Sequence, residues 1–291
     1  MVCTNKVFIF PNPTRAKTQR ALPEILDFLL SEGFSVTMEE RYEYMLGEEY
    51  PIVSFYPMET AAQQSDFVLV VGGDGTILHI AALAARLGKP VLGINLGTMG
   101  FLSEMDMSDL EMLRKIKAGD YVVDERMMID AIVYNSNDEE VFFASGLNDV
   151  AMMKGDISKI VRLCVSVNER KVMGFAGDGA VVCTPTGSTA YSLSAGGPVL
   201  EPNSPCIAVT PVCPHALGIK SFVVSSDKEI EVVSPPQSNT VHLSVDGHQN
   251  RNLEPGERTV IRQSAHSLSL IRLKGIGFYE RINQKLINER F

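Results

Sequence analysis

The sequence contains no apolar stretch near the roughly 20 residues that a membrane-spanning helix needs. The apolar run at its start is also too short for a secretory signal peptide, and Asn-Pro-Thr follows at once. Positive charge is scarce: 26 Lys and Arg stand against 35 Asp and Glu, a formal net charge of −9. That average field repels duplex nucleic acid and anionic membranes, so neither is an expected partner.

Cysteine is also scarce, and its five positions form no C-x-x-C pair. The odd count and the spacing argue against a disulfide framework and a zinc ribbon. Reduced, buried thiols are expected instead, which fits a cytoplasmic location. The five histidines show no metal-ligand spacing, so no metal site built from protein side chains is expected.

Three common catalytic motifs are missing. The G-x-G-x-x-G fingerprint of dehydrogenases fails around Gly73 and Gly75, because Leu78 stands where its third glycine belongs. No G-x-x-x-x-G-K-[ST] segment occurs, which excludes a P-loop protein, and no G-x-S-x-G nucleophile elbow is present. Because the net charge is negative, any phosphate-bearing substrate must be held by local backbone amides, helix ends, a few cations or Mg²⁺.

What remains is an ordinary globular composition over 291 residues, 45% of them hydrophobic. This length predicts two domains with enough apolar side chain for their cores. We expect an α/β domain over residues 1–122 and a β-rich domain over residues 123–273. A helical tail over residues 274–291 is expected to pack back on the first domain.

The first domain alternates strand-like and helix-like segments. Residues 67–71 form a continuous apolar run, which predicts a strand covered on both faces. Residues 41–57 are hard to assign, and a loop is expected there. Strands are expected at residues 7–10, 34–38, 67–71 and 91–94, and helices over residues 22–30, 77–87 and 108–119. This order predicts a parallel sheet with helices on both faces.

Short strands dominate after Tyr121. Residues 161–167 alternate apolar and polar side chains, as in a half-buried strand. Residues 129–134 and 141–144 flank a polar Asn-Ser-Asn-Asp segment, which predicts a β-hairpin. Residues 279–290 have helical character.

The most informative motif is Gly-Gly-Asp-Gly-Thr at residues 72–76, between the apolar strand and a predicted helix. A glycine-rich turn that leads into a helix is an anion site, because backbone amides converge there. Asp74 places a carboxylate in that site, which is unfavourable beside a phosphate unless it accepts a proton or binds Mg²⁺. The alternative is a tight turn in which Asp74 caps the helix. His79 lies one helical turn beyond Gly75 and would face the same pocket.

Four further segments are candidates for ligand contacts. Residues 184–198 combine hydroxyl groups, glycines and Tyr191, and could bind phosphate, ribose or base, although such a stretch is also typical of a loop. Asp178 is either a turn residue or a group that accepts hydrogen bonds from donors on a ligand. Asn148 and Asp149 suit a nucleoside, but taken alone they are better explained by an ordinary turn. Residues 95–102 follow a strand and carry two glycines, which allow a close backbone approach to a ligand.

Together these motifs resemble the NAD kinase family. GGDGT alone is shared with phosphofructokinases and with diacylglycerol and sphingoid lipid kinases. The run TPTGSTAYSLSAGGP is far more specific, and NLGTMGFL, ERMM, LNDV and CPHAL agree in order. The resemblance extends from residue 7 to about residue 273. Two positions depart from it: His248 stands where the family often has Gln, and Gly218-Ile219 replaces a common Arg-Pro pair.

The resemblance implies an α/β domain followed by a β-rich domain, and a homodimer or homotetramer. It implies that Asp74 is the base acting on the adenosine 2′-hydroxyl of NAD, with ATP or polyphosphate as donor and Mg²⁺ or another divalent metal on the donor phosphates. The implied contacts with NAD are Asp74, Gly75, His79, Phe101, Asn148, Asp149, Lys159, Asp178, Thr189, Ala190, Tyr191, Ser192, Leu193 and Ser194. A lipid or sugar kinase that shares the GGDGT turn, or a non-catalytic dinucleotide sensor, remains the alternative.

Overall fold

The computed structural model describes residues 5–14, 16–97, 100–156, 158–216, 218–254 and 256–287. The chain divides into two compact units: Met1–Glu125 with Leu268–Phe291, and Arg126–Ser267. Within the described residues, no helix combines the length and hydropathy required to span a membrane. Cys164, Cys183, Cys206 and Cys213 are free thiols, and Cys3 lies outside the described residues.

The first unit is built on a parallel sheet, as the sequence predicts. Its strands follow the order β5-β4-β1-β2-β3, and both β6 and the end of β18 pair with β5. Val7 and Ile9 of β1 pack in the core on one face of the sheet. Phe8, the residue between them in the sequence, is also fully buried. The strands are β1 (Lys6–Pro11), β2 (Ser35–Glu39), β3 (Ser54–Tyr56), β4 (Phe67–Gly72), β5 (Val91–Asn95) and β6 (Met105–Asp106).

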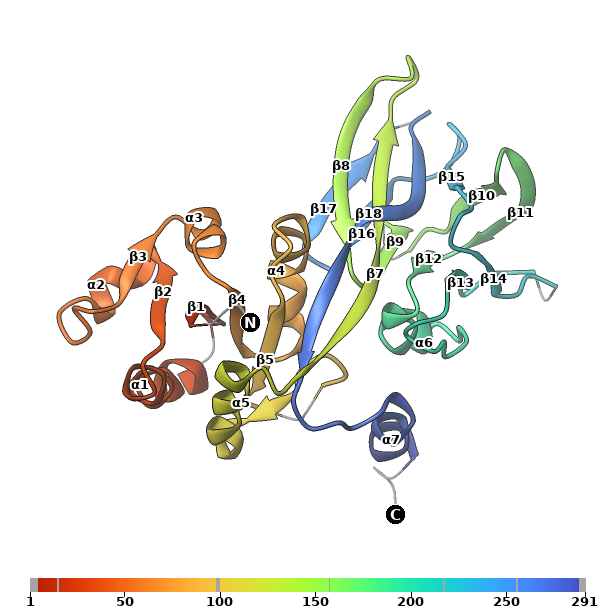
Figure 1. Cartoon of the computed structure of the whole chain (residues 1–291). Helices are drawn as coiled ribbons and strands as arrows, with labels where there is room; N and C mark the ends of the chain where they lie inside the picture. The colour runs from red at the N-terminus through yellow and green to blue at the C-terminus, as the bar shows by residue number, and fades with distance from the viewer. Residues whose placement is uncertain are drawn as a thin grey trace. The chain divides into compact units, whose positions relative to one another are not determined.

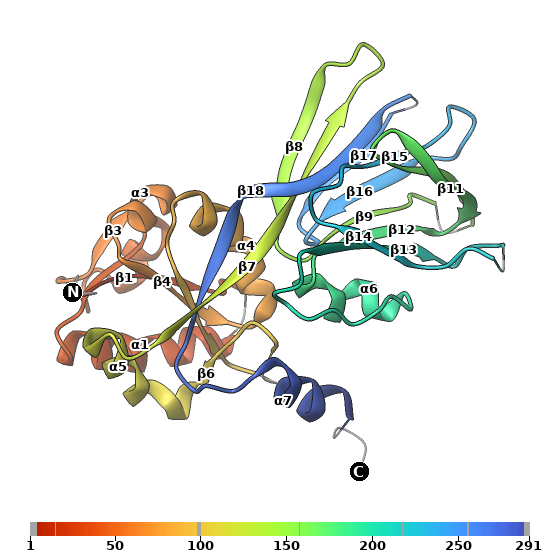
Figure 2. The same ribbon diagram turned by 45° about the vertical axis from the view of Figure 1, so that its right-hand side comes forward.

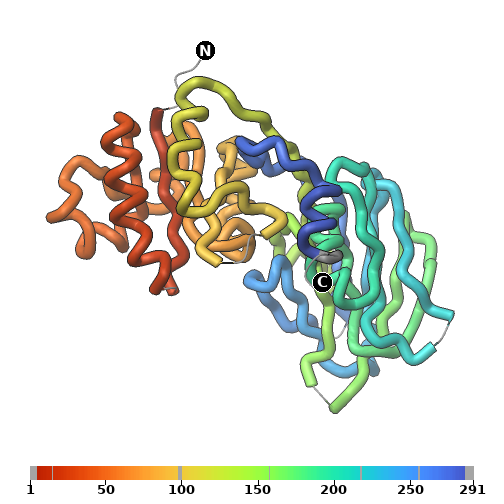
Figure 3. Tube along the Cα trace, turned by 90° about the horizontal axis from the view of Figure 1, so that it is seen from below, coloured from red at the N-terminus to blue at the C-terminus, as the bar shows by residue number. Residues whose placement is uncertain are grey.

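Helices cover both faces of this sheet (Figure 1). Leu22, Ile25 and Leu26 of α1 (Ala16–Ser31) share a core with Val7 and Ile9 of β1, and α5 (Leu113–Ala118) joins the same core. Figure 3 views the unit from this side. The helices α3 (Met58–Gln63) and α4 (Asp74–Arg86) lie on the opposite face. The remaining helical segments are η1 (Glu40–Tyr42), α2 (Glu43–Leu46), η2 (Met107–Met112), α7 (Phe278–Ile282) and η4 (Asn283–Ile287).

Several predicted boundaries in this unit were wrong. The helix expected to begin at residue 77 begins at Asp74, directly after the turn. The single helix expected over residues 108–119 is divided into η2 and α5, and η2 is capped by Asp106, whose carboxylate accepts the Ser108 N–H. Residues 41–57 are not a plain loop, since η1, α2 and β3 lie within or across them. The tail is helical over α7 and η4, and residues 288–290 of the expected helix lie outside the described part.

The second unit consists of antiparallel strands, which confirms the β-rich prediction. One sheet has the order β14-β13-β12-β9-β16-β17, and the other joins β11, β10, β15, β18, β7 and β8. Val150, Val182 and Leu243 from the first sheet pack with Ile129 and Ile261 from the second in a shared core. The strands from β7 to β12 are β7 (Val122–Tyr134), β8 (Glu140–Gly146), β9 (Asp149–Lys154), β10 (Val161–Val167), β11 (Arg170–Gly177) and β12 (Gly179–Cys183).

The outer face of the first of these sheets is also covered. Val181, Cys183 and Ala208 form a smaller buried cluster there, next to η3 (Thr186–Thr189) and α6 (Tyr191–Ser194) (Figure 2). The predicted hairpin is β7 and β8, whose turn places Asp138 at a φ of 62°. The remaining strands are β13 (Cys206–Val212), β14 (Phe222–Ser225), β15 (Ile230–Val233), β16 (Val241–Val245), β17 (Gln249–Leu253) and β18 (Arg258–Arg272).

Candidate active site

The strand order of the first unit reverses between β1 and β4. After β1 the chain continues to β2 on one side, and after β4 it continues to β5 on the other. In open α/β sheets, ligands bind in the crevice at the carboxyl ends of the strands at such a switch point. Asn12 follows β1 and Gly73 follows β4 at this edge. The fold therefore places the GGDGT turn at the edge where a ligand is expected.

A cavity of about 390 Å³ opens at this edge. The amino end of α4 contributes to its wall, and the first amides of a helix have no partner within the helix. Asp74, Gly75 and His79, which the sequence singles out, all line the cavity. The full lining consists of Asn12, Gly73, Asp74, Gly75, Thr76, His79, Asn95, Gly97, Gly100 and Lys285.

The carboxylate of Asp74 is bound by the segment that follows β5. Its Oδ2 accepts the N–H groups of Phe101 at 2.6 Å and Leu102 at 3.1 Å. Its Oδ1 accepts the N–H and the hydroxyl of Ser103 at 3.1 and 2.8 Å. Two bonds on each oxygen use the roughly four lone-pair positions of an ionised carboxylate. The helix-capping alternative was therefore wrong, because Asp74 is the first residue of α4 and its carboxylate binds a different segment.

Three glycines give this arrangement its space. A Cβ atom on Gly100 would lie 1.7 Å from Oδ1 of Asp74, so the carboxylate occupies the position of the missing side chain. A Cβ atom on Gly72 would lie 2.3 Å from the hydroxyl oxygen of Thr76. Gly75 has no atom within 4 Å of its Cβ position, since that position faces open space. The first two glycines allow close packing, and the third leaves the cavity open.

Thr76 and Asn12 connect the turn to the end of β1. The Asn12 amide nitrogen donates to the Thr76 hydroxyl at 3.1 Å, and the Gly73 N–H donates to the same oxygen at 3.4 Å. The side-chain oxygen Oδ1 of Asn12 accepts the N–H and the hydroxyl of Thr14, which is an Asx turn. These bonds hold the loops after β1 and β4 together.

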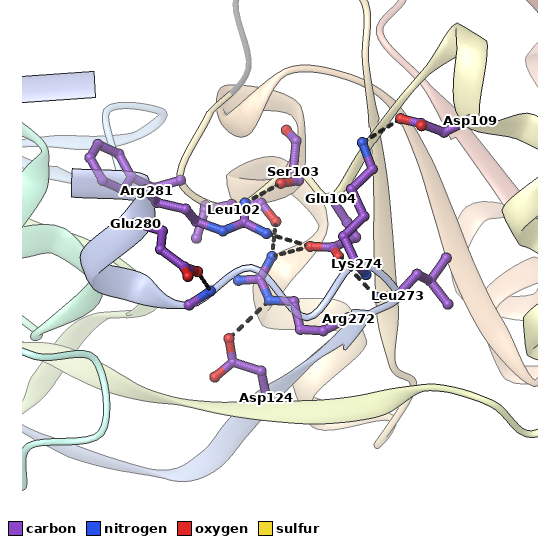
Figure 4. A network of polar contacts seen from close by, with 12 residues as sticks. Leu102, Ser103, Glu104, Asp109, Asp124, Arg272, Leu273, Lys274, Glu280 and Arg281 are labelled. Atoms are coloured by element: carbon purple, nitrogen blue, oxygen red, sulfur yellow. Dashed lines mark hydrogen bonds and ion pairs between the residues drawn. The ribbon is translucent and has the colours of Figure 1, made fainter. Parts of the chain in front are cut away.

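The segment that binds Asp74 is itself held on its other side (Figure 4). The Leu102 carbonyl accepts a guanidinium N–H of Arg272 at 2.9 Å, and the Ser103 carbonyl accepts one of Arg281 at 2.8 Å. Both arginines also pair with Glu104, whose side chain is 1% exposed. The other Glu104 oxygen accepts the N–H groups of Leu273 and Lys274 at 2.9 and 2.7 Å. Residues 101–104 are thus fixed between Asp74 and the C-terminal segment.

In the second unit, Asp246 organises the loop that carries Asn148 and Asp149. Its carboxylate accepts the N–H groups of Leu147, Asn148 and Asp149 at 2.7, 2.8 and 3.0 Å. Asp149 is itself buried, with 7% of its surface exposed. Burial, together with the neighbouring charge of Asp246, raises the pKa of Asp149 to about 7. Burial also raises the pKa of Asp246, against the three N–H donors that lower it.

The Ser/Thr/Gly segment packs directly on this loop. A Cβ atom on Gly187 would lie 2.0 Å from the Asn148 carbonyl oxygen, and that oxygen accepts the Thr184 N–H at 2.9 Å. Ser192 is fully buried, and its hydroxyl lies 3.0 Å from that of Thr210. Tyr191, by contrast, is 39% exposed. Thr189, Ala190 and Leu193 are half-buried, and Ser194 is exposed.

Asp178 and Lys159 occupy different surroundings. Asp178 pairs with Lys154 at 2.7 Å. Burial raises the pKa of Tyr191, and the charges of Asp149, Cys213 and Asp178 add to this rise. Lys159 lies between β9 and β10 and pairs with Asp156 at 3.6 Å, with 58% of its side chain exposed.

The expected site residues of the first unit lie together. Asp74, Gly75 and His79 share the cavity, and Phe101 donates its N–H to Asp74. In the second unit, Asn148 and Asp149 lie at one end of the paired strands β9 and β12, and Asp178 lies at the other end. Residues 189–194 follow β12 and extend from η3 into α6, whereas Lys159 lies apart, between β9 and β10.

The sequence reasoning missed several residues. Asn12 had a usable signal, since Asn-Pro-Thr directly after a strand is typical of a turn. Ser103 and Glu104 follow the glycine-containing segment but match no motif. Arg272, Arg281 and Lys285 lie more than 160 residues from the segment that they contact, and no local pattern indicates them.

Comparisons with known proteins cover almost the whole chain. Residues 7–121 match the ATP-NAD kinase N-terminal domain, and residues 147–273 match the ATP-NAD kinase C-terminal domain. The chain is 38% identical over 271 residues to the NAD kinase of Carboxydothermus hydrogenoformans, which covers 93% of this chain and 96% of that protein. It is 39% identical over 264 residues to the NAD kinase of Symbiobacterium thermophilum, which covers 90% of this chain and 92% of that protein.

Two solved structures are similar in fold. Yeast NADH kinase complexed with NADH superimposes with a TM-score of 0.91 at 23% identity, covering 100% of this chain and 90% of that one. An NAD kinase from Archaeoglobus fulgidus in complex with ATP gives a TM-score of 0.70 at 26% identity, covering 92% and 94%.

Proposed function

Since the chain belongs to the NAD kinase family, we propose that Asp74 is the general base with which it phosphorylates NAD to NADP. The observation that supports this role is the position of its carboxylate in the cavity at the β1/β4 switch point. A carboxylate beside the amino end of a helix opposes phosphate binding unless it takes part in the reaction.

In the proposed step, the adenosine 2′-hydroxyl gives its proton to an oxygen of Asp74. The 2′ oxygen forms a bond to the γ-phosphorus of ATP, the bond from this phosphorus to the β–γ bridging oxygen breaks, and its electron pair leaves with ADP. Catalysis of such transfers is almost entirely positioning and electrostatic stabilisation. The amide of Gly75 at the start of α4 supplies part of the latter.

The substrate hydroxyl has to donate a hydrogen bond to a carboxylate that already accepts four hydrogen bonds. Three of the donors are backbone N–H groups, fixed by the path of residues 101–103. The fourth is the Ser103 hydroxyl, which can rotate without moving the backbone. In our proposal this hydroxyl turns away from Oδ1 when NAD binds, and the 2′-hydroxyl takes its place.

Mg²⁺ fits the oxygen atoms of this cavity. It prefers carboxylate and carbonyl oxygens, keeps several waters, and usually takes further ligands from substrate phosphates. Asn95 lines the cavity and carries an amide oxygen, whereas both oxygens of Asp74 already accept hydrogen bonds, so Mg²⁺ would take most of its ligands from the donor phosphates and water. When bound with the donor, Mg²⁺ would neutralise part of the phosphate charge.

The proposal assigns contacts with NAD in the second unit to the residues around β9 and β12. Because the Ser192 hydroxyl is engaged with Thr210 inside the unit, its contribution would come through the backbone. Tyr191 is exposed enough to stack on a base. The complete set is Asn148, Asp149, Lys159, Asp178, Thr189, Ala190, Tyr191, Ser192, Leu193 and Ser194. The proposal also includes a cytoplasmic location and a homodimer or homotetramer.

The direct test combines purified protein, Mg²⁺ and NAD with either ATP or polyphosphate, followed by an NADP-specific readout. We expect NADP with ATP, and the polyphosphate arm decides whether the donor range is wider. A parallel screen with labelled ATP offers lipid and sugar acceptors. Phosphorylated lipid or sugar without NADP would contradict the proposal, and so would tight NAD binding without transfer from either donor.

A further inference from the structure

A lysine from the end of the described chain lines the cavity that contains Asp74. Lys285 belongs to η4, which follows α7 directly. Its ammonium group lies 5.0 Å from the centre of the Phe101 ring, and the Phe101 N–H donates to Asp74. Phe101 therefore contacts both Lys285 and the proposed base, Asp74.

Buried polar contacts fix α7, the helix that directly precedes the segment carrying this lysine. Arg281, four residues before Lys285, is 6% exposed and donates to the Ser103 carbonyl at 2.8 Å. It also pairs with Glu104, which is 1% exposed (Figure 4). The segment η4 continues directly from α7, so the anchored position of Arg281 restricts where Lys285 can lie. The same anchor thus holds residues 101–104 against Asp74 and directs Lys285 to the cavity.

The charges that line the cavity indicate a role for this lysine in binding an anionic group. Lys285 is the one Lys or Arg among the described residues that line it, and Asp74 adds a negative charge. A donor that carries several phosphate charges meets the amides of α4 there but also the repulsion of the carboxylate. A lysine ammonium is a compact charge on a flexible stem, which suits phosphate binding.

We propose that Lys285 is a donor-binding residue, whose ammonium group pairs with the terminal phosphates of the donor in this cavity. The proposal rests on the proposed function, since it assumes that the phosphoryl donor binds beside Asp74.

The kinetic test compares Lys285→Met, which keeps the length of the stem, with Lys285→Arg, which keeps the charge. ATP is varied at saturating NAD, and NAD at saturating ATP. We expect KM for ATP to rise roughly tenfold in Lys285→Met, the effect of about 1.4 kcal/mol. KM for NAD should change less than about twofold, and Lys285→Arg should recover most of the loss. Gln284→Met, at an exposed neighbouring position, is the matched control.

A binding test does not depend on turnover. Inorganic tripolyphosphate with Mg²⁺ should raise the melting temperature of the wild-type protein and of Gln284→Met, and raise that of Lys285→Met clearly less. An unchanged KM for ATP together with an unchanged tripolyphosphate effect would overturn the proposal. A parallel rise in both KM values with a lower melting temperature would also overturn it, because that result indicates a structural role. Absence of NADP formation by the wild-type protein would instead contradict the proposed function.

Discussion

Gly100 and Asp74 occupy complementary space: the position that a Cβ atom of Gly100 would take lies 1.7 Å from Oδ1 of Asp74. The carboxylate can accept the N–H groups of Phe101 and Leu102 and both donors of Ser103 only because residue 100 has no side chain. The glycine in this segment therefore serves the proposed base and not a turn. This relationship can be tested directly.

Gly100→Ala should displace the Asp74 carboxylate, because backbone-linked Cβ and carboxylate cannot share that space. A displacement near 1 Å can cost about 10²-fold in rate, so we expect at least that loss in kcat for NADP formation. The matched variant is Gly75→Ala, whose Cβ meets no atom within 4 Å. It should fold with unchanged or slightly higher stability, by up to about 1 kcal/mol, since alanine favours a helix over glycine. Equal kcat in Gly100→Ala and wild type would show that the carboxylate position is not critical.

Asp74→Asn should lose turnover by about 10²–10⁴-fold, the usual contribution of a general base. NAD binding, measured by titration calorimetry, should stay within a few-fold of wild type. Ser103→Ala is the control: it removes one of the four hydrogen bonds, the one from a rotatable hydroxyl, and should cost less than about tenfold. Near-normal turnover in Asp74→Asn would remove the general-base assignment.

Glu104→Gln should destabilise the protein strongly. The substitution removes a negative charge that is shared by Arg272 and Arg281, and it leaves two nearly buried guanidinium groups without that charge. Breaking a buried ion pair on one side typically costs about 3–5 kcal/mol in the free energy of unfolding. Glu111→Gln is the control, because Glu111 is 74% exposed and pairs with Arg114 on the surface, where about 1 kcal/mol or less is expected. Denaturant unfolding measures the free energy of unfolding of both variants. Equal losses in Glu104→Gln and Glu111→Gln would contradict the prediction.

The raised pKa of Asp149 predicts a pH dependence of stability. The folded protein holds this proton up to about pH 7, whereas the unfolded chain releases it near 3.8. The unfolded state binds fewer protons between these values, so stability falls as pH rises through this window. Relative to Asp149→Asn, the wild-type protein should lose on the order of 2–4 kcal/mol of unfolding free energy from pH 4 to pH 8. A constant difference between the two proteins over that range would contradict the prediction.

Much of the fold was readable in the sequence because its signals are local. The apolar run at residues 67–71, followed at once by glycines, correctly indicated a central parallel strand and a helix after it. The alternation over residues 161–167 and the polar turn between β7 and β8 were equally direct. The start of α4 was predicted less accurately. Its first residues belong to the glycine-rich turn, and the helical spacing of apolar side chains begins only after them.

The surroundings of Asp74 could not be read in the same way. The sequence indicated a carboxylate at an anion site, but left helix capping open, because the partner segment lies 27–29 residues further along the chain. Glu104, Arg272 and Arg281 are joined across 168 to 177 residues. No periodicity connects such positions, since their proximity depends on where β18 and α7 return to the sheet.

The sequence by itself determined the class of each unit, the place of the GGDGT turn between strand and helix, and the family resemblance. Those features depend on side-chain alternation, glycine conformation and motif order, which act over a few residues. Only the tertiary structure decided which groups hold Asp74, why Gly100 must lack a side chain, and that Lys285 reaches the cavity. Those features arise when segments far apart in the chain pack together, because hydrogen bonds and excluded volume act between neighbours in space and not in sequence.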